Sequence, residues 1–435
     1  MYLLFKRPAA LLLFVALTLV LAARGVVPAL SKVDTDFPNY FTAAKIVADG
    51  GDTDRLYDNA WFQDQMRRYQ IGKASEGQFK PFPPPTALLL VPLARLQPLD
   101  ALRVLTVVSA LGLIWSIMLL ARILSWSLVD STVFVLLSGY AVLGALRLGQ
   151  PYILVSLSCI LGYYARLQGR PALAGMCLGL LTPIKYFPVV FLVYFAFRKE
   201  WKVVLGGAAA ILLVAALSVG ILGWKIHENF LSSVIGNHLV AKLDLQDPFT
   251  ASYQSLDSLF RRLFVYDATL NPRPLYPLPR LQGMAVLITK ASILLAAIGS
   301  IVKLARRGGD TEIGSSIDAD SRTGPSVGAG SAAGPSIGIL GVVTLLLAPA
   351  TATYHFVLLW LPVGLLIDYF VRQGARMRAY FILGAYALIG FFPYRYTVPF
   401  EGRGGLTVLA YPRLFLLLAM FVACVHFIWS RAEPV

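Results

Sequence analysis

The sequence predicts an all-α protein that crosses a membrane many times. The chain has 435 residues, of which 57% are hydrophobic and only 14% are charged, and its mean hydropathy is +0.69. Its apolar residues form repeated runs close to the ~20 residues that a helix needs to cross the hydrocarbon core of a bilayer, which soluble domains do not show. The runs are continuous rather than alternating, which excludes a transmembrane β-barrel.

The apolar runs fall into two length classes. The long runs cover residues 8–30, 101–121, 128–146, 203–223, 283–303, 378–394 and 406–429. The shorter runs cover residues 83–96, 150–165, 171–183, 186–197, 338–349 and 356–371. Together they predict about 11–13 transmembrane or re-entrant helices, several of them too short to span the bilayer alone.

The formal net charge of +15 is scattered in short basic clusters between the apolar runs. Such clusters mark the cytoplasmic ends of membrane helices and contact lipid headgroups, so we expect no nucleic-acid partner. Lys6 and Arg7 precede the first run, which continues to Leu30 and predicts an uncleaved helix with its N-terminus inside. We expect a multi-pass protein of a bacterial plasma membrane with both termini cytoplasmic. The other clusters are Arg166/Arg170, Arg198-Lys199, Arg306-Arg307 and Arg372/Arg376/Arg378.

Two long polar segments, residues 31–80 and 224–282, are expected to face outward. Short helical stretches are expected within them, at 39–48, 58–70 and 253–264. Between the first polar segment and the next long run, prolines interrupt residues 83–96 and predict a short or partly inserted helix there. The charges leave open how often residues 83–125 cross the membrane.

The low-complexity composition of residues 308–336 predicts a disordered cytoplasmic linker. We therefore expect a transmembrane core over 1–304 that carries both outward loops, a linker over 305–336, and C-terminal transmembrane helices of the same domain over 337–435.

Three apolar stretches that lie between basic clusters are broken in the middle. The break residues are RLGQP (147–151), TPIK (182–185) and APATATYH (348–355). Each resembles a hairpin of helices whose tip enters the membrane from inside and points outward. Broken helices at membrane depth occur where they are buried in protein or line a wet cavity, so three polar tips indicate an outward-facing cavity. Ordinary Pro or Gly kinks in long helices are the alternative.

Few ionisable residues lie close to the apolar segments. Asp34 and Asp36 follow the first run directly, as candidates for general-base chemistry at the membrane surface or as solvated loop residues. Lys185, at the second break, calls for an anionic partner, which a protein carboxylate or a ligand phosphate would supply. His355, at the third break, is either a ligand-binding residue or a hydrogen-bonding residue between helices. The cysteines, Cys159, Cys177 and Cys424, have no disulfide or metal spacing and are interpreted as packing residues.

Short motifs occur in a fixed order between about residues 30 and 370. They are Asp-x-x-x-Tyr-x-x-Ala-Ala (Asp36, Tyr40, Ala43, Ala44), Leu56-Tyr57-Asp58, Phe82-Pro-Pro-Pro with Pro92-Leu-Ala-Arg-Leu, Gly149-Gln150, Gly175 with Ile184-Lys185, Gln254-Ser255, and Pro349 with Tyr354-His355. The ordered set resembles glycosyltransferase family 87, the polytopic polyprenol-phosphate-mannose-dependent mannosyltransferases of the GT-C superfamily. The chain departs from the family pattern at Ala348, where serine is usual, at Pro151, where asparagine is usual, and at Thr353-Tyr354-His355, which stands for a His-His or Trp-Ser-His cluster.

The resemblance implies a GT-C-like fold and a metal-independent, inverting glycosyltransferase. Such an enzyme moves a hexosyl group, mannosyl in the family, from a polyprenyl-phosphate sugar to a hydroxyl of a glycolipid or glycan on the extracytoplasmic side. It implies that Asp36 is the general base and that Lys185 and His355 stabilise the departing phosphate.

The remaining implied roles concern binding. Gln150 and Tyr40 would fix the sugar or the phosphate, and the apolar hairpins would bind the polyprenyl tail. Arg261 and Arg262 would meet the headgroup from an interfacial helix, and Asp34 would assist or be solvated.

Other interpretations of the same residues remain open. Asp34-Thr35-Asp36 also reads as Asp-x-Asp, which holds a divalent cation in nucleotide-sugar enzymes, but a lipid-phosphate donor needs no metal, and no cofactor is expected. A membrane transporter or lipid flippase would also carry broken helices and charges at membrane depth, although we find no paired repeats. A non-catalytic membrane scaffold is a third possibility, which leaves Lys185 without a charged ligand.

Overall fold

The computed structural model describes residues 7–73, 75, 77–239, 247–307 and 332–430. Within these ranges the regular structure is helical, and the β-type pairing is one isolated bridge between Asp267 and Asn271. The predicted all-α fold class is therefore confirmed.

Among the described helices, six are long and apolar enough to cross a membrane. The pair α6 (Leu128–Leu136) and α7 (Tyr140–Arg147), whose axes bend by 76°, raises the number to seven if it is one broken span. The run at 356–371, expected to be short, joins a preceding 3₁₀ helix in a candidate span, whereas the run at 378–394 forms the shorter α18 (Arg376–Phe391). The six are Arg7–Ser31 (α1, Arg7–Leu21, a π-helical stretch at Ala22–Val26, and α2, Val27–Ser31), α5 (Pro98–Leu124), α11 (Trp201–Leu222), α15 (Pro279–Arg307), Thr353–Arg372 and α19 (Pro412–Ser430).

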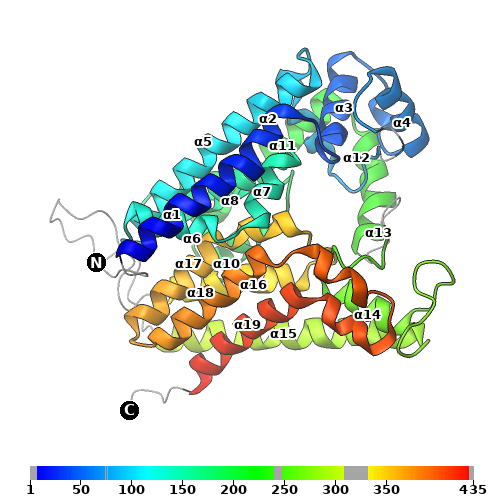
Figure 1. The fold of residues 1–435 in the computed structure, drawn as a ribbon. Coiled ribbons are helices and arrows are strands. Elements are labelled where there is room, and N and C mark those ends of the chain that lie inside the picture. Colours follow the sequence, from blue (N-terminus) through cyan, green and yellow to red (C-terminus); the bar gives the residue numbers. More distant parts are fainter. Residues whose placement is uncertain (1–6, 74, 76, 240–246, 308–331, 431–435) are drawn as a thin grey trace.

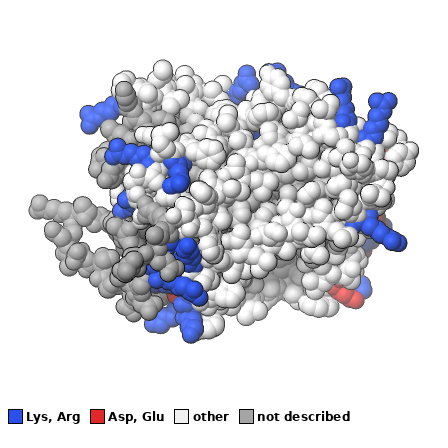
Figure 2. All heavy atoms as spheres, turned by 90° about the horizontal axis from the view of Figure 1, so that it is seen from below, with Lys and Arg blue, Asp and Glu red and all other residues white. Residues whose placement is uncertain are grey.

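The spans run between two ends of the molecule. The start of α1 and the end of α19 lie at one end, here called the inner end, and α3 (Phe37–Ala48), α4 (Asn59–Arg68) and α14 (Leu256–Phe264) lie at the opposite, outer end (Figure 1). On the face that Figure 2 shows, Lys and Arg gather mainly toward these two ends and leave a broad uncharged area between them. Leucines within the spans are highly exposed, such as Leu12 (72%), Leu212 (68%) and Leu287 (70%), as expected for contact with lipid chains. Together these features indicate an integral membrane protein.

The described residues between 31 and 97 lie at the outer end, because the helices on either side of them meet there. Nε of Arg103, in the first turns of α5, donates to the carbonyl of Leu30 in α2 at 2.9 Å. The segment at 83–96, expected to be a short or partly inserted helix, contains a short apolar helical stretch, Pro84–Leu93, made of two 3₁₀ helices, Pro84–Leu88 and Val91–Leu93. Its prolines prevent a continuous helix, and Ala87, Leu90 and Ala94 pack into the outer lobe. Within residues 83–125, α5 is the helix that is long and apolar enough to cross a membrane.

The outer lobe has a hydrophobic core of its own. The expected helical stretches at 39–48 and 58–70 correspond to α3 and α4, which pack together through Phe37, Phe41, Phe62 and Met66. Helix α4 begins where the Asp58 side chain accepts the Trp61 amide N–H at 3.1 Å, a regular N-cap. The lobe is thus a folded unit that carries the start of α3.

Three helix breaks occur at the residues that the sequence indicated. We call them the first tip (147–151), between α7 and α8 (Tyr152–Leu167), the second tip (182–185), between α9 (Pro171–Leu181) and α10 (Val189–Phe197), and the third tip (348–355), after α16 (Ala333–Leu347). The third tip continues into a 3₁₀ helix, Thr353–Leu359, and α17 (Trp360–Arg372). At each tip the regular helix ends, so side chains there can turn toward other elements.

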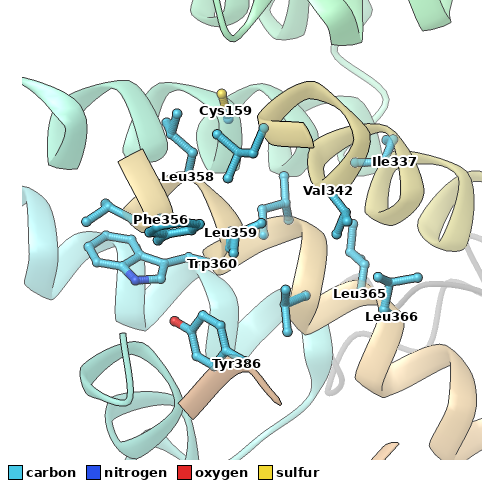
Figure 3. Packing of buried hydrophobic residues seen from close by; sticks show 14 of the residues in the cluster. Cys159, Ile337, Val342, Phe356, Leu358, Leu359, Trp360, Leu365, Leu366 and Tyr386 are labelled. Atoms are coloured by element: carbon cyan, nitrogen blue, oxygen red, sulfur yellow. The ribbon is translucent and has the colours of Figure 1, made fainter. Parts of the chain in front are cut away.

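A tightly packed core supports the third tip. Phe356, Leu359, Trp360 and Tyr386 are each at most 1% exposed and lie together with neighbouring leucines and valines (Figure 3). Nε1 of Trp360 donates to Oγ of Ser138 at 3.3 Å, which ties the start of α17 to the break between α6 and α7. Because protein interiors tolerate little displacement, this packing fixes the position of the 3₁₀ helix, to which Phe356 and Leu359 belong.

The rest of the second outward loop is also partly helical. It contains α12 (Lys225–Asn229), a π-helical stretch (Phe230–Val234), α13 (Ile235–Leu239) and α14, which corresponds to the helical stretch expected at 253–264. Helix α15 extends to Arg307 and α16 begins at Ala333. Most of the expected linker, residues 308–331, lies outside the described residues.

Candidate active site

Asp36 stands directly before α3, at the position where an aspartate ordinarily caps a helix by accepting an amide N–H of its first turn. Its side chain makes no such cap. Instead, Nε2 of Gln150 donates to Asp36 Oδ2 at 2.6 Å, while the backbone carbonyl of Asp36 accepts the Asn39 N–H at 3.1 Å. The carboxylate therefore faces the first tip rather than its own helix.

A chain of hydrogen bonds joins α3 to the first and second tips. Nζ of Lys185 donates to Oη of Tyr40 at 3.2 Å, and Tyr40 Oη donates to Oε1 of Gln150 at 2.7 Å. Gln150 then donates to Asp36. Tyr40 and Gln150 are each 1% exposed, so the middle of the chain is shielded from solvent. Four residues that the sequence singled out separately are thus in direct contact.

Lys185 lies among aromatic rings. Its Nζ is 4.7 Å from the ring centroid of Phe82, 4.9 Å from that of Tyr152 and 5.5 Å from that of Tyr40. We call these three rings the aromatic cage. Aromatic faces attract cations, so the cage holds the ammonium at the second tip together with the through-space attraction of Asp36. Oη of Tyr57 donates to the Phe82 carbonyl at 2.7 Å and fixes the segment that carries this ring.

The residue before Gln150 must be glycine. Gly149 has φ +63°, in the left-handed region that residues with a Cβ rarely adopt. A Cβ here would lie 2.8 Å from Cδ2 of Phe37, the residue next to Asp36. The Gly149-Gln150 pair thus allows the first tip to approach the start of α3 closely enough for the hydrogen bond to Asp36.

His355 lies at the third tip. Its Nδ1 accepts the Ala352 N–H at 3.1 Å, so the neutral ring carries its proton on Nε2. The ring packs against Tyr152 at 4.6 Å between centroids. Because Tyr152 also belongs to the aromatic cage, it brings the third tip next to the second.

A second set of polar residues holds the third tip in place. The Gln254 N–H donates to the Thr351 carbonyl at 3.0 Å, and Oγ of Ser255 donates to the Pro349 carbonyl at 2.9 Å. Nη1 of Arg413 donates to Oγ1 of Thr353 at 2.7 Å, and the Arg413 N–H donates to Oε1 of Gln254 at 3.0 Å. The sequence noted Gln254-Ser255 without giving it a role and did not indicate Arg413, a buried arginine at the start of a membrane span.

Asp34 and Asp36 have different partners. Oδ2 of Asp34 pairs with Nη2 of Arg147 at 3.0 Å. Arg147 was not among the predicted site residues, although its position in the first break was the signal that could have found it. Since the two carboxylates turn to different groups of the first tip, they do not converge as an Asp-x-Asp cation site requires. In the part of the chain that the structure describes, no group of three or more His, Cys, Asp or Glu is arranged to hold a metal ion.

The two arginines of α14 are placed differently from the expectation. Arg262 is 5% exposed, pairs with Oε2 of Glu401 at 2.8 Å, and donates to the carbonyls of Leu270 (3.1 Å) and Phe249. It is therefore buried inside the protein rather than on a face that meets a lipid headgroup, because the loop before α19 folds over α14. Arg261 is partly buried, and burial lowers the pKa of its guanidinium although Asp257 opposes this shift.

Burial also sets the ionisation of the site. It raises the pKa of Asp36 above the ordinary carboxyl value, while the hydrogen bond from Gln150 and the charge of Lys185 act in the opposite direction. Burial raises the pKa of Tyr40 well above that of an ordinary phenol, so this residue remains a hydroxyl donor. A carboxylate with a raised pKa is a stronger base, and the charge of Lys185 acts on it through space.

Comparison with known proteins identifies the family. The sequence model of Glycosyltransferase family 87 matches residues 81–315, more than half of the chain, so the chain belongs to this family. The matched part contains Gln150 and Lys185, whereas Asp36 and Tyr40 precede it and His355 follows it. No curated protein and no solved structure matches the chain.

Proposed function

We propose that this member of glycosyltransferase family 87 transfers a hexosyl group, mannosyl in the first instance, from a polyprenyl phosphate to a hydroxyl group of a glycolipid or glycan acceptor. The observation that carries the proposal is the Asp36 carboxylate. It follows the first candidate membrane span, and its side chain does not cap α3. Instead, it accepts a hydrogen bond from Gln150 at the first tip, and through Tyr40 this tip is connected to Lys185. This arrangement unites a base and a cation at one end of a membrane protein.

Asp36 acts as the general base. It takes the proton of the acceptor hydroxyl as the hydroxyl oxygen attacks the anomeric carbon of the donor from the face opposite the phosphate. The new carbon–oxygen bond forms as the bond from the anomeric carbon to the phosphate oxygen breaks, so the configuration inverts. The phosphate keeps the electron pair and leaves on its polyprenyl chain.

Lys185 and His355 stabilise the leaving group. A phosphate monoester is a good leaving group, so positive charge and hydrogen-bond donors suffice without a strong acid. Lys185 supplies the charge from the second tip, and His355 supplies a donor at Nε2 because its Nδ1 is already an acceptor. The reaction needs no metal ion in this scheme.

The membrane placement completes the proposal. The apolar helices of the broken pairs bind the polyprenyl chain, and the sugar is presented at the outer end. By the positive-inside rule, the basic clusters support an orientation with both termini in the cytoplasm of a bacterial cell. The transfer then occurs on the extracytoplasmic side.

The test uses purified protein in lipid vesicles with a panel of polyprenyl-phosphate sugars and a hydroxyl acceptor. Asp36→Asn is expected to reduce transfer by about 10³-fold or more, because the neutral amide of asparagine cannot take the proton of the acceptor hydroxyl. Asp64→Asn, on the exposed face of α4, is the matched control and should leave transfer unchanged. Full activity of Asp36→Asn would refute its role as base, and movement of lipid or solute without sugar transfer would favour a transporter.

A further inference from the structure

The hydrogen bonds between Lys185 and Asp36 have one direction when Lys185 is protonated. Burial lowers the pKa of Lys185 to about 7, while the charge of Asp36 opposes this shift. A protonated lysine carries donors and no acceptor, so Tyr40 Oη accepts from Lys185 and directs its own proton to Gln150. The Gln150 amide therefore presents Oε1 to Tyr40 and Nε2 to Asp36. The cation at the second tip thus determines that Asp36 faces a donor.

Burial maintains this direction. Tyr40 remains protonated because burial raises its pKa well above that of an ordinary phenol, and Gln150 is 1% exposed, so water does not compete for either residue. Both polar atoms of the Gln150 side chain already have partners. With both atoms engaged and the side chain buried, we assign Gln150 to holding Asp36 rather than to binding a sugar or phosphate, the role that the family resemblance implied.

The two carboxylate oxygens of Asp36 are not equivalent. Oδ2 accepts from Gln150 at 2.6 Å, a short charge-assisted hydrogen bond. Among the described residues, Oδ1 has only the Thr35 hydroxyl, at 3.4 Å, which is a long and weak contact. Oδ1 therefore has lone pairs available to an incoming hydroxyl, whereas Oδ2 is occupied.

We propose that Gln150 and Tyr40 are positioning residues which, together with Lys185, hold Oδ2 of Asp36 and leave Oδ1 as the atom that takes the acceptor proton. This inference rests on the proposed function and specifies its atoms. The acceptor O–H bond breaks, the proton goes to Oδ1, and the freed electron pair forms the bond to the anomeric carbon. The hydrogen bond at Oδ2 fixes the carboxylate plane during this step.

The pH dependence of the reaction reports on this arrangement. Without the donor at Oδ2, the ionised form of Asp36 loses stabilisation, and the acid limb of the kcat profile moves to higher pH. Of the ionisable groups near Asp36, only Tyr40 is changed in the variants below. The ionisable groups that face Asp36 are Asp34 with its partner Arg147, Lys185, Tyr40, Tyr152, Tyr253 and Tyr354.

The test compares Tyr40→Phe and Gln150→Met with the unchanged protein in vesicles, using a polyprenyl-phosphate hexose and a saturating acceptor. We expect kcat to fall about tenfold or more and the acid limb to rise by about one pH unit, the usual size for loss of a hydrogen bond to a charged group. The KM values of both substrates should stay within about twofold, because neither side chain touches a substrate. Tyr163→Phe is the control, since it is also buried and its hydroxyl has no partner in the described part of the chain.

The outcomes separate this inference from the proposed function. If Asp36→Asn is inactive but both variants keep the original pH profile, Gln150 and Tyr40 are not positioning residues and only this inference falls. A raised donor KM with an unchanged profile would instead make Tyr40 or Gln150 a substrate contact and overturn it. Tyr40→Phe keeps the ring that packs on Phe82, so it remains informative if Gln150→Met does not fold.

Discussion

Replacing Gly149 with alanine should destabilise the protein and disturb the close packing of the first tip against α3. Two costs add at this position. A residue with a Cβ in the left-handed region pays about 1–2 kcal/mol, since φ is +63°. The added Cβ would also lie 2.8 Å from Cδ2 and 3.0 Å from Cβ of Phe37, an overpacking that typically costs about 1–3 kcal/mol. The expected total is about 2–5 kcal/mol.

Gly50→Ala is a matched control for the first cost. Gly50 has φ +68° and nothing within 4 Å of the position of a Cβ, so it pays only the conformational penalty. Thermal unfolding in lipid vesicles should rank the unchanged protein above Gly50→Ala and Gly50→Ala above Gly149→Ala. Sugar transfer should fall in Gly149→Ala alone, because relief of the clash moves Phe37 and with it Asp36 away from Gln150. Equal stability and equal activity of the two variants would refute the argument that close approach at Gly149 builds the site.

The other expectations concern ionisation and ion pairs. Because burial raises the pKa of Asp36, a base at this position is active when deprotonated, and kcat should decline with falling pH through a value above the ordinary carboxyl range, as a pH–rate profile would show. Arg262→Met should destabilise the protein by about 3–5 kcal/mol because it leaves Glu401 buried without its cation, and Glu401→Gln in the same chain should recover part of this loss in thermal unfolding. Asp34→Asn and Arg147→Met should each lower the free energy of unfolding by less than about 1 kcal/mol, because their ion pair is partly exposed. A larger loss in thermal unfolding would contradict this expectation.

Much of the fold follows from local sequence signals. The apolar runs and the prolines at the three breaks predict long and broken helices because hydrocarbon imposes both the length of a span and the satisfaction of its backbone groups. At 83–96 the prolines predict a short helix, and the structure has one in two 3₁₀ pieces, but the sequence did not reveal what this segment packs against. Its leucines count as apolar in a sequence window, yet they pack against the aromatic residues of the outer lobe, which lie far away in the sequence.

At the candidate site, too, the sequence identified single residues but not the contacts between them. Spacing and motif order indicated Asp36, Tyr40, Gln150 and Lys185 individually, but the hydrogen bonds that join them span 110 to 145 positions of the chain. Only the folded arrangement reveals that Oε1 and Nε2 of Gln150 already have hydrogen-bond partners. Arg262 is the converse case, because an amphipathic pattern with basic residues looks the same whether a lipid surface or another loop covers the helix.

The aromatic cage around Lys185 affects how strongly this residue attracts a bound phosphate. A lysine in water must give up part of its hydration shell before it can pair with an anion, and that reorganisation subtracts from the attraction. Rings on three sides of Lys185 take the place of water when the protein folds, so the desolvation is already complete before any donor arrives. Burial lowers the pKa of Lys185 to about 7, so an incoming phosphate favours the protonated lysine. In these low-dielectric surroundings the Coulomb attraction between the two charges is larger than at an exposed lysine.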